Sequence, residues 1–282
     1  MWFNVFIAFG FKFYVQWRKL LFNYEDYMNS LIIIGCGWLG SQVAADFIEK
    51  KYRVFGTTTT KNKLPELQAR GVIPILMKIH QGKELSLPDT EAVLIALPPG
   101  RGRKRGEYPA KIKALANGLK SKSSQIIMCS STSVYKGMHG CVEESDAESN
   151  INNENVILAA EGELLTQVED AVILRLGGLI GKERHPFKYL IGRKSIKNGD
   201  APVNLVYGED VSAAVEILVN NNIRKQVYNL VSTDHPSRKN YYTRVAEQKE
   251  LDAPEFETGG SKCKLVTSAK FIDHFGHEFK NL

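Results

Sequence analysis

Three glycines near the start of the chain have the clearest chemical signature. Residues 31–40 have the sequence LIIIGCGWLG, so the spacing G-x-G-x-x-G directly follows four apolar residues. In such a motif Gly35 permits the tight turn out of a strand, Gly37 leaves the main chain bare for a diphosphate, and Gly40 lets the next helix pack on the strand. Free N–H groups at the start of that helix attract an anion. The sequence therefore predicts a dinucleotide-binding loop, which also includes Cys36, Trp38 and Leu39.

The end of the second expected strand, at residues 53–56, bears on which dinucleotide is bound. Proteins that prefer NAD usually place Asp or Glu there, to accept hydrogen bonds from the ribose hydroxyls. This chain has no acidic residue between Glu49 and Glu66, and its side chains there could instead donate hydrogen bonds to a 2′-phosphate. These donors are Thr57, Thr58, Thr59, Lys61 and Lys63. We predict NADP(H) in preference to NAD(H); the alternative is a solvated turn with two surface lysines.

Alternating strands and helices must hold these loops in place. Continuous apolar strands that alternate with helices are typical of a doubly wound parallel sheet, the Rossmann type of α/β fold. Ligands of such sheets collect beyond the carboxyl ends of the strands, so we expect Leu97, Pro98 and Ser130 to contact the dinucleotide too. Further strands are expected at 72–76, 92–97, 125–129, 171–176 and 203–206, and helices after Gly37, at 64–70, 110–119, 156–168, 238–248 and 268–275, and from Glu209 onward.

The chain is expected to divide into three parts. Residues 28–176 and 203–231 would form the NAD(P)-binding Rossmann domain, and 177–202 with 232–282 a smaller substrate-side lobe. Residues 1–27 form an expected poorly structured extension that is too short and polar to span a membrane and lacks the features of a signal peptide. We interpret Met28 as the natural initiator; the alternative for the upstream segment is a weak membrane-surface or partner-binding helix.

Composition excludes several classes of protein. A chain of 282 residues with 43% hydrophobic content can bury the core of one large domain or two small ones. The four cysteines form no C-x-x-C pair and no ligand spacing with the six histidines, which suits a reducing cytoplasm and predicts no metal site. Part of the net charge of +6 lies in RGRKR at residues 101–105. We interpret this cluster as a solvated loop, with contact to an anionic substrate or NADP second and nucleic-acid binding third, because a second basic stripe and stacking aromatic residues are lacking.

Several motifs along the chain occur together in one known superfamily. The run CSSTSVY at residues 129–135 resembles the end of the fifth strand in the extended short-chain dehydrogenase/reductases, which include sugar-nucleotide epimerases and dehydratases. The glycine motif, RLGGLIG at 175–181, RHP at 184–186, VNLV at 203–206 and VYNL at 227–230 add to the match. From about residue 28 to the C-terminus the chain is similar to an atypical branch, the YeeZ-like proteins.

The resemblance implies catalytic roles but also shows a departure. Ser131 occupies the catalytic serine position, where it would hydrogen-bond a substrate hydroxyl or carbonyl. In the superfamily a Tyr-x-x-x-Lys pair follows on a helix, where the lysine lowers the pKa of the tyrosine so that its phenolate accepts a proton. This chain has no such pair, no tyrosine between Tyr135 and Tyr189, and no lysine between Lys136 and Lys182. The standard hydride-transfer mechanism is therefore not supported.

Two residues are candidate substitutes for the missing pair. Tyr135 closely follows the serine strand and would donate a proton, unless it packs in a structural turn. His185 has a side chain with a near-neutral pKa and lies in the loop over the expected cleft, unless it is a hydrogen-bonding surface residue. Glu154 and Asn155, near the missing tyrosine, are acid/base candidates or simply a polar helix start.

We therefore predict an NADP(H)-binding oxidoreductase or epimerase-like enzyme acting on a small polar, sugar-like metabolite, with Ser131 holding the reacting group. The alternative is a non-catalytic dinucleotide-binding redox sensor or regulator, which the missing Tyr-Lys pair favours. The expected partner is a small-molecule substrate, and we expect neither nucleic acid nor a membrane to bind. The oligomer that we consider is a homodimer.

Overall fold

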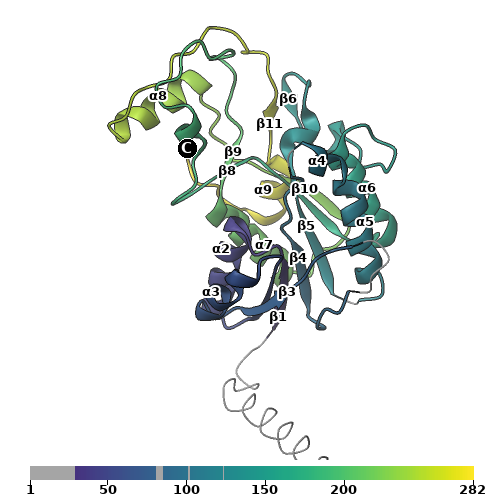
Figure 1. Cartoon of the computed structure of the whole chain (residues 1–282). Coiled ribbons are helices and arrows are strands. Elements are labelled where there is room, and N and C mark those ends of the chain that lie inside the picture. Colours follow the sequence, from purple (N-terminus) through teal and green to yellow (C-terminus); the bar gives the residue numbers. More distant parts are fainter. Residues whose placement is uncertain (1–28, 81–84, 101, 123) are drawn as a thin grey trace, which may run out of the picture.

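A seven-stranded parallel sheet forms the centre of the computed structural model, which describes residues 29–80, 85–100, 102–122 and 124–282 (Figure 1). The expectations for residues 1–27 and for Met28 lie outside this part. The strand order is β10-β7-β5-β4-β1-β2-β3. From β1 the chain adds β2 and β3 on one side, then returns to place β4 on the other. This reversal beside β1 is the switch point of a doubly wound sheet, which confirms the predicted fold class.

The elements follow the expected order closely. The strands of the sheet are β1 (Ser30–Ile34), β2 (Arg53–Thr58), β3 (Ile73–Leu76), β4 (Ala92–Ile95), β5 (Gln125–Ser131), β7 (Val172–Leu176) and β10 (Gln226–Leu230). The helices are α2 (Trp38–Glu49), α3 (Leu64–Ala69), α4 (Arg103–Gly106), α5 (Tyr108–Leu119), α6 (Val156–Gln167), α7 (Gly208–Asn220), α8 (Arg238–Gln248) and α9 (Ala269–Phe275). Two short pairs, β6 (Cys141–Val142) with β11 (Leu265–Val266) and β8 (Gly178–Ile180) with β9 (Leu205–Tyr207), lie outside the sheet.

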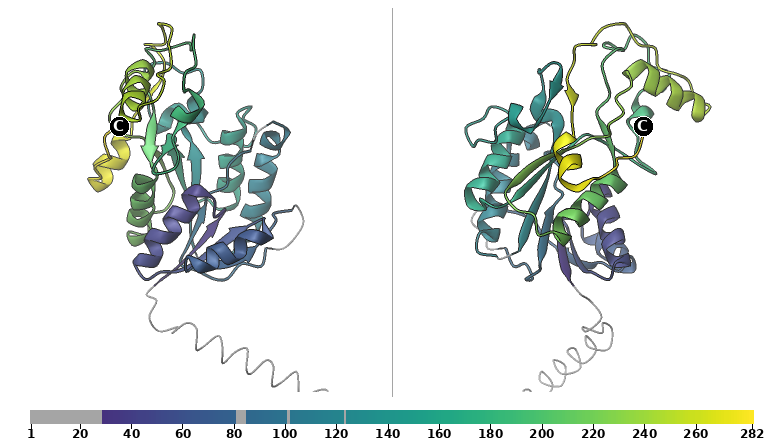
Figure 2. Two further views of the ribbon diagram at one scale, coloured as in Figure 1. Left: turned by 60° about the vertical axis from the view of Figure 1, so that its left-hand side comes forward. Right: turned by 180° about the vertical axis from the view of Figure 1, so that it is seen from behind.

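Helices cover both faces of the sheet because its strands are apolar on both faces. In β1, Leu31 and Ile33 pack with residues of α2 and α7, whereas Ile32 and Ile34 pack with residues of α5 and α6. Side chains alternate between the faces of a strand, so each half of the apolar run fills a different core. Figure 2 shows α2 and α7 on one face and α5 and α6 on the other.

Two strand ends differ from the expected ranges and affect the site. The strand expected at 92–97 stops at Ile95, shortly before Pro98 and Pro99, which have no backbone N–H to continue a ladder. The strand expected at 125–129 continues to Ser131, which pairs with Leu176 of β7. A proline-ended loop and a serine pair therefore meet at the carboxyl edge of the sheet.

The smaller lobe lies beyond this carboxyl edge, at the upper left of Figure 1. Its separate core joins Phe187, Val203 and Leu205 to Tyr241 and Val245 of α8. The end of the chain differs from the expected division, which assigned all of 232–282 to the lobe. Phe271 of α9 and Phe279 belong instead to the same core as Leu31 and Phe47. The last segment thus returns to the Rossmann domain.

Candidate functional site

The glycine-rich loop makes a sharp turn between β1 and α2. Gly35 has a φ of 101°, in the left-handed region that favours glycine. Its N–H donates a hydrogen bond to Thr57 Oγ1 at 2.9 Å. A Cβ atom on Gly35 would lie 3.0 Å from the carbonyl oxygen of Ala96. The turn is therefore fixed by β2 on one side and by the loop after β4 on the other.

The other two glycines have different surroundings. A Cβ atom on Gly40 would lie only 2.5 Å from the carbonyl oxygen of Gly35, so helix and strand can approach only because Gly40 has no side chain. A Cβ atom on Gly37 would meet nothing within 4 Å. Gly37 caps α2 without a side-chain hydrogen bond, and the first turn has no acidic residue. The first N–H groups of α2 therefore face open space, and this backbone cradle fits a diphosphate.

A cavity of about 380 Å³ opens beside the cradle, at the carboxyl ends of β1, β4, β5 and β7. Of the predicted coenzyme contacts, its lining includes Gly37, Trp38, Leu39, Gly40, Leu97, Pro98 and Ser130. Its lining further includes residues that were not predicted to contact a ligand: Ala96, Pro99, Tyr108, Cys129, Ile157, Leu176, Gly177, Gly178, Leu179 and Arg184. The predicted serine Ser131 completes the wall at the end of β5. The structure thus brings the predicted coenzyme loop and the predicted serine to one cavity.

The two serines at the end of β5 have different partners. Ser130 Oγ donates to the carboxylate of Glu161, a fully buried group that is held by Arg175 at 2.9 Å. Ser131 Oγ accepts a hydrogen bond from the N–H of Ser133 at 3.1 Å. Within the described part of the chain no acceptor takes the hydroxyl proton of Ser131, so this serine can still donate to a ligand.

Tyr135 lies away from the cavity and is fully buried. Its hydroxyl donates to Asn229 Oδ1 at 2.8 Å and accepts from Arg175 at 3.0 Å. Burial raises the pKa of this phenol, although Arg175 acts in the opposite direction. The geometry therefore contradicts the acid–base role considered for Tyr135 and corresponds to the alternative of a structural turn, because both hydrogen-bonding functions of its oxygen are already used.

His185 is similarly engaged, in the smaller lobe. Its Nδ1 accepts from the N–H of Phe187 at 3.1 Å, which leaves Nε2 as the protonated nitrogen, 2.8 Å from the hydroxyl of Tyr241. Burial lowers the pKa of this imidazole, with a further contribution from Lys249. His185 does not line the cavity that contains Ser131. It caps the short 3-10 helix Pro186–Tyr189, and this position argues against a role as proton carrier.

Helix α6 contributes no replacement for the missing Tyr-Lys pair. Asn155 caps this helix by accepting from the N–H of Ile157 at 3.0 Å, and Glu154 is exposed. The side chain that α6 presents to the cavity is the apolar Ile157. Asn155 therefore forms the polar helix start that was the alternative interpretation. Helix α6 adds no titratable side chain to the lining of the cavity.

The threonines and lysines at the end of β2 and in the turn after it have three different surroundings. Thr57 is buried and holds the turn at Gly35, while Thr58 Oγ1 accepts from the N–H of Thr60 at 3.1 Å. Thr59 and Lys61 are exposed. Lys63 lines a second cavity, of about 600 Å³, together with Cys36, Gly37, Ser41 and Arg70. Of the two predicted lysines, only Lys63 therefore borders the glycine loop.

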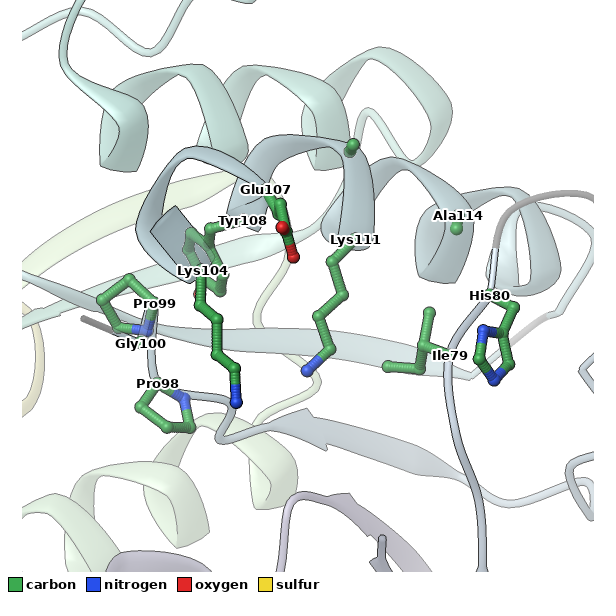
Figure 3. Close-up of a pocket in the computed structure, with 11 residues that line it drawn as sticks. Ile79, His80, Pro98, Pro99, Gly100, Lys104, Glu107, Tyr108, Lys111 and Ala114 are labelled. Atoms are coloured by element: carbon green, nitrogen blue, oxygen red, sulfur yellow. The ribbon is translucent and has the colours of Figure 1, made fainter. Parts of the chain in front are cut away.

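A third cavity, of about 500 Å³, lies across the loop after β4 (Figure 3). Pro98, Pro99 and Tyr108 line both this cavity and the one that contains Ser131. Figure 3 shows the amino groups of Lys104 and Lys111 extending from the helices toward the same space. Burial lowers the pKa of Lys111, and the charge of Lys104 lowers it further. Part of the basic cluster at 101–105 thus borders a cavity next to the expected coenzyme cleft.

Two buried thiols near the cleft have a raised pKa. Burial raises the pKa of Cys129 to about 12 and that of Cys36 to about 11. Both thiols stay protonated at neutral pH, so neither supplies the thiolate that nucleophilic catalysis needs.

Two further features are absent from the described ranges. No group of three or more His, Cys, Asp and Glu side chains is placed to hold a metal ion there. No helix in that part of the chain is both long and apolar enough to cross a membrane.

Comparison with known proteins agrees with this geometry. No family model matches the chain. Protein YeeZ of Escherichia coli (strain K12) is 28% identical over 272 residues, which cover 90% of this chain and 96% of YeeZ. Among solved structures, a functionally unknown conserved protein from Silicibacter pomeroyi DSS has a TM-score of 0.70 at 20% identity, covering 90% of this chain and 94% of that one.

An enzyme structure of similar fold is UDP-glucuronic acid 4-epimerase from Bacillus cereus, solved in complex with NAD. It has a TM-score of 0.68 at 19% identity and covers 86% of this chain and 89% of that one. The fold and the glycine cradle define a Rossmann-type α/β protein. By sequence the chain is similar to YeeZ over nearly the whole length of both chains, which agrees with the resemblance to YeeZ-like proteins seen in its motifs.

Proposed function

We propose that this protein binds NADP(H) and acts as an oxidoreductase or epimerase-like enzyme on a small polar metabolite. The observation that carries the proposal is the bare cradle at Gly37, which opens into the same cavity as the free hydroxyl of Ser131. The fold is shared with an epimerase that was solved with NAD, which supports a nicotinamide dinucleotide as the ligand.

In this proposal the chain's own residues position the coenzyme and the substrate. The first turn of α2 holds the diphosphate, and Leu97, Pro98 and Ser130 border the cavity that would receive the nicotinamide end. A nicotinamide dinucleotide, when bound, supplies hydride exchange. Ser131 orients the reacting hydroxyl or carbonyl of the substrate by donating its free proton in a hydrogen bond.

Base catalysis by the protein has little support in this cavity. Burial raises the pKa of both Tyr108 and Cys129, and Ile157 faces the cavity from α6. Groups that keep their protons at neutral pH cannot abstract one. The proposed contribution of the protein is therefore orientation and exclusion of water.

The preference for NADP(H) rests on the end of β2. No carboxylate lies on β2 or in the turn that follows it, and Lys63 lines the cavity beside Gly37. The same cavity also has two carboxylates, that of Glu66, which is paired with Arg70, and that of Glu183. We propose Lys63 as the main phosphate contact, in preference to Lys61, because both lysines are exposed but only Lys63 lines this cavity.

Calorimetric titration of the full-length protein with NADPH and NADH tests this proposal. We expect NADPH to bind at least about tenfold more tightly, equal to ~1.4 kcal/mol. The variant Lys63→Ala should lose most of that preference, and Lys61→Ala should retain it. An equal or greater affinity for NADH in the unchanged protein would refute the NADP(H) assignment. Loss of the preference in a Lys104→Ala/Lys111→Ala variant alone would move the phosphate contact to the third cavity.

The second candidate function is a redox sensor that binds the dinucleotide without turnover. The specific observation in its favour is the wall formed by Ile157, where an enzyme of this class needs a proton-transferring group. Incubation of the NADPH complex with a panel of carbonyl metabolites distinguishes the two functions. Oxidation of NADPH with any member of the panel supports the enzyme, whereas binding without turnover throughout supports the sensor.

A further inference from the structure

Trp38, inside the glycine-rich motif, is held in one position by residues distant in the sequence. A Cβ atom on Gly181 would lie 2.9 Å from its indole, and one on Gly208 would lie 2.8 Å from it. Both positions therefore accept only glycine while the indole stays where it is. The ring is packed against the glycines at the end of β8 and the start of α7, and it forms a fixed platform at the edge of the cavity that contains Ser131.

Arg184 lies on this platform. Its guanidinium carbon is 5.3 Å from the centre of the Trp38 ring, a distance at which the cation and the ring attract each other. The backbone is fixed as well, because the N–H of Gly181 donates to the carbonyl of Arg184 at 2.8 Å and the N–H of Arg184 donates back at 3.0 Å. The Trp38 ring and the backbone bridge to Gly181 together place the guanidinium at the rim of the cavity, where Arg184 is an exposed residue of the lobe.

The charge of Arg184 is not neutralised by the protein. Within the described ranges no carboxylate forms an ion pair with it, and it is the one formally charged residue in the lining of its cavity. The wall is otherwise made of apolar groups such as Leu97, Ile157 and Leu179, with the two serines as neutral polar groups. A guanidinium presents its donors in a planar fork that matches a carboxylate or a phosphate.

We propose that Arg184 is the specificity-determining residue for the substrate and that the substrate carries an anionic group, a carboxylate or a phosphate. This inference rests on the proposed function and narrows its substrate class. With Arg184 binding the anionic group and Ser131 binding the reacting hydroxyl or carbonyl, the substrate is held at two points. Two fixed points orient a small molecule far better than one.

The diphosphate of the coenzyme is the other anion near Arg184. We place the diphosphate at the first N–H groups of α2, which belong to the Rossmann domain. Arg184 belongs to the lobe, in the loop that follows β8. We therefore assign Arg184 to the substrate, and the test below separates the two anions.

The experiment measures binding to the full-length protein and to Arg184→Met and Arg184→Lys variants. Methionine retains an apolar chain over Trp38 without the charge, and lysine retains the charge without the fork. Each protein is first titrated with NADP+ and NAD+, and then, saturated with the tighter of the two, with pairs of probes that differ in one charge: lactate against propane-1,2-diol, and glucuronate against glucose. Arg193→Met, at an exposed arginine of the same lobe, is the control.

We expect the unchanged protein and the Arg193→Met control to bind at least one anionic probe about tenfold or more tightly than its neutral partner. Arg184→Met should abolish this difference and Arg184→Lys should reduce it, while the affinity for the coenzyme changes by less than about threefold. Equal binding of charged and neutral probes, or no binding of any anionic probe, overturns the proposal. The proposal is also overturned if Arg184→Met weakens coenzyme binding but still binds the anionic probe more tightly than its neutral partner. If the unchanged protein bound neither coenzyme, the proposed function itself would fail, which is a separate result.

Discussion

At the scale of single residues, the main finding is that Ser130 and Ser131 differ although they are neighbours. Ser130 donates to the buried carboxylate of Glu161, whereas the proton of Ser131 is not taken by any described group. Both residues line the cavity, but the hydroxyl of Ser130 is bound to a core carboxylate and only that of Ser131 keeps its proton for a ligand. Adjacent residues of a strand point to opposite faces, which explains the difference.

Ser131→Ala provides the direct test of this division. We expect NADPH to bind as before, and any turnover found with a carbonyl substrate to fall at least about tenfold, because the substrate loses its hydrogen bond in a cavity with few polar groups. Ser133→Ala, one turn away, is the matched control and should keep its activity. Full activity in Ser131→Ala, measured by NADPH absorbance, would remove the serine from the mechanism.

His185 predicts a dependence of stability on pH. Its pKa is lowered in the folded protein, so the unfolded chain binds the proton more readily. The resulting stabilisation is complete above the ordinary histidine pKa of about 6.5 and is lost as the pH falls through the lower value of the folded state.

His185→Asn isolates this contribution. Asparagine can still accept from the N–H of Phe187, as His185 does, but it does not titrate. Melting temperatures at several pH values between about 8 and 5 should fall more steeply in the unchanged protein than in the variant. Parallel curves would show that the other histidines account for the whole effect.

At the scale of elements, the loop from β1 to α2 separates folding from binding. Gly40 is needed for the contact between helix and strand, whereas the space beside Gly37 is open. Gly37 has a φ of −87°, which alanine adopts without strain. The same substitution at the two positions should therefore have opposite consequences.

Gly40→Ala should lower the free energy of unfolding by about 1–3 kcal/mol, because its methyl group is forced against the carbonyl of Gly35. Gly37→Ala should fold normally but bind NADPH about tenfold or more weakly, because the methyl group occupies the place of the diphosphate. Gly106→Ala, also beside open space, serves as the control for both measurements. A Gly37→Ala variant with unchanged affinity would remove the ligand from this loop.

The sequence was sufficient to predict these elements but not the partners of their side chains. The spacing of Gly35, Gly37 and Gly40 after an apolar run has one common structural context, so the loop and its sheet followed directly. The residues next to Tyr135 in the sequence do not indicate its hydrogen bonds to Arg175 and Asn229, because both partners are distant in the chain. Arg184 lies in the RHP motif at 184–186, but its proposed role in substrate binding depends on the ring of Trp38, which lies far upstream in the sequence.

At the scale of the whole molecule, the lobe and the Rossmann domain are connected by more than one crossing of the chain. After α8 in the lobe, β11 pairs with β6, and α9 then packs beneath β10. Lys280 donates its backbone N–H to Asp210 at the start of α7, at 3.1 Å. The sequence pattern predicts the helix that became α9 but not the part of the molecule on which it packs. These long-range contacts show that the last segment belongs to the Rossmann domain and not to the lobe.

Phe279 tests the importance of that return. Its side chain is 7% exposed and lies in the core shared with Phe47 and Phe271. Phe279→Ala should cost about 3 kcal/mol of unfolding free energy, as expected for an aromatic residue removed from a core. Tyr189→Ala, at a residue that is 62% exposed, should cost less than about 0.5 kcal/mol. Urea denaturation measures both, and equal effects would show that the last segment adds no stability.

The position of Phe279 also bears on biosynthesis. Of the described strands, β1 leaves the ribosome first, and it supplies Leu31 to a core that lacks Phe271 and Phe279 until much later in translation. Contacts between residues so far apart in sequence form late and slowly. The nascent Rossmann domain therefore keeps an unfilled apolar face until Phe279 has been translated, and transiently exposed surface of this kind is what chaperones bind.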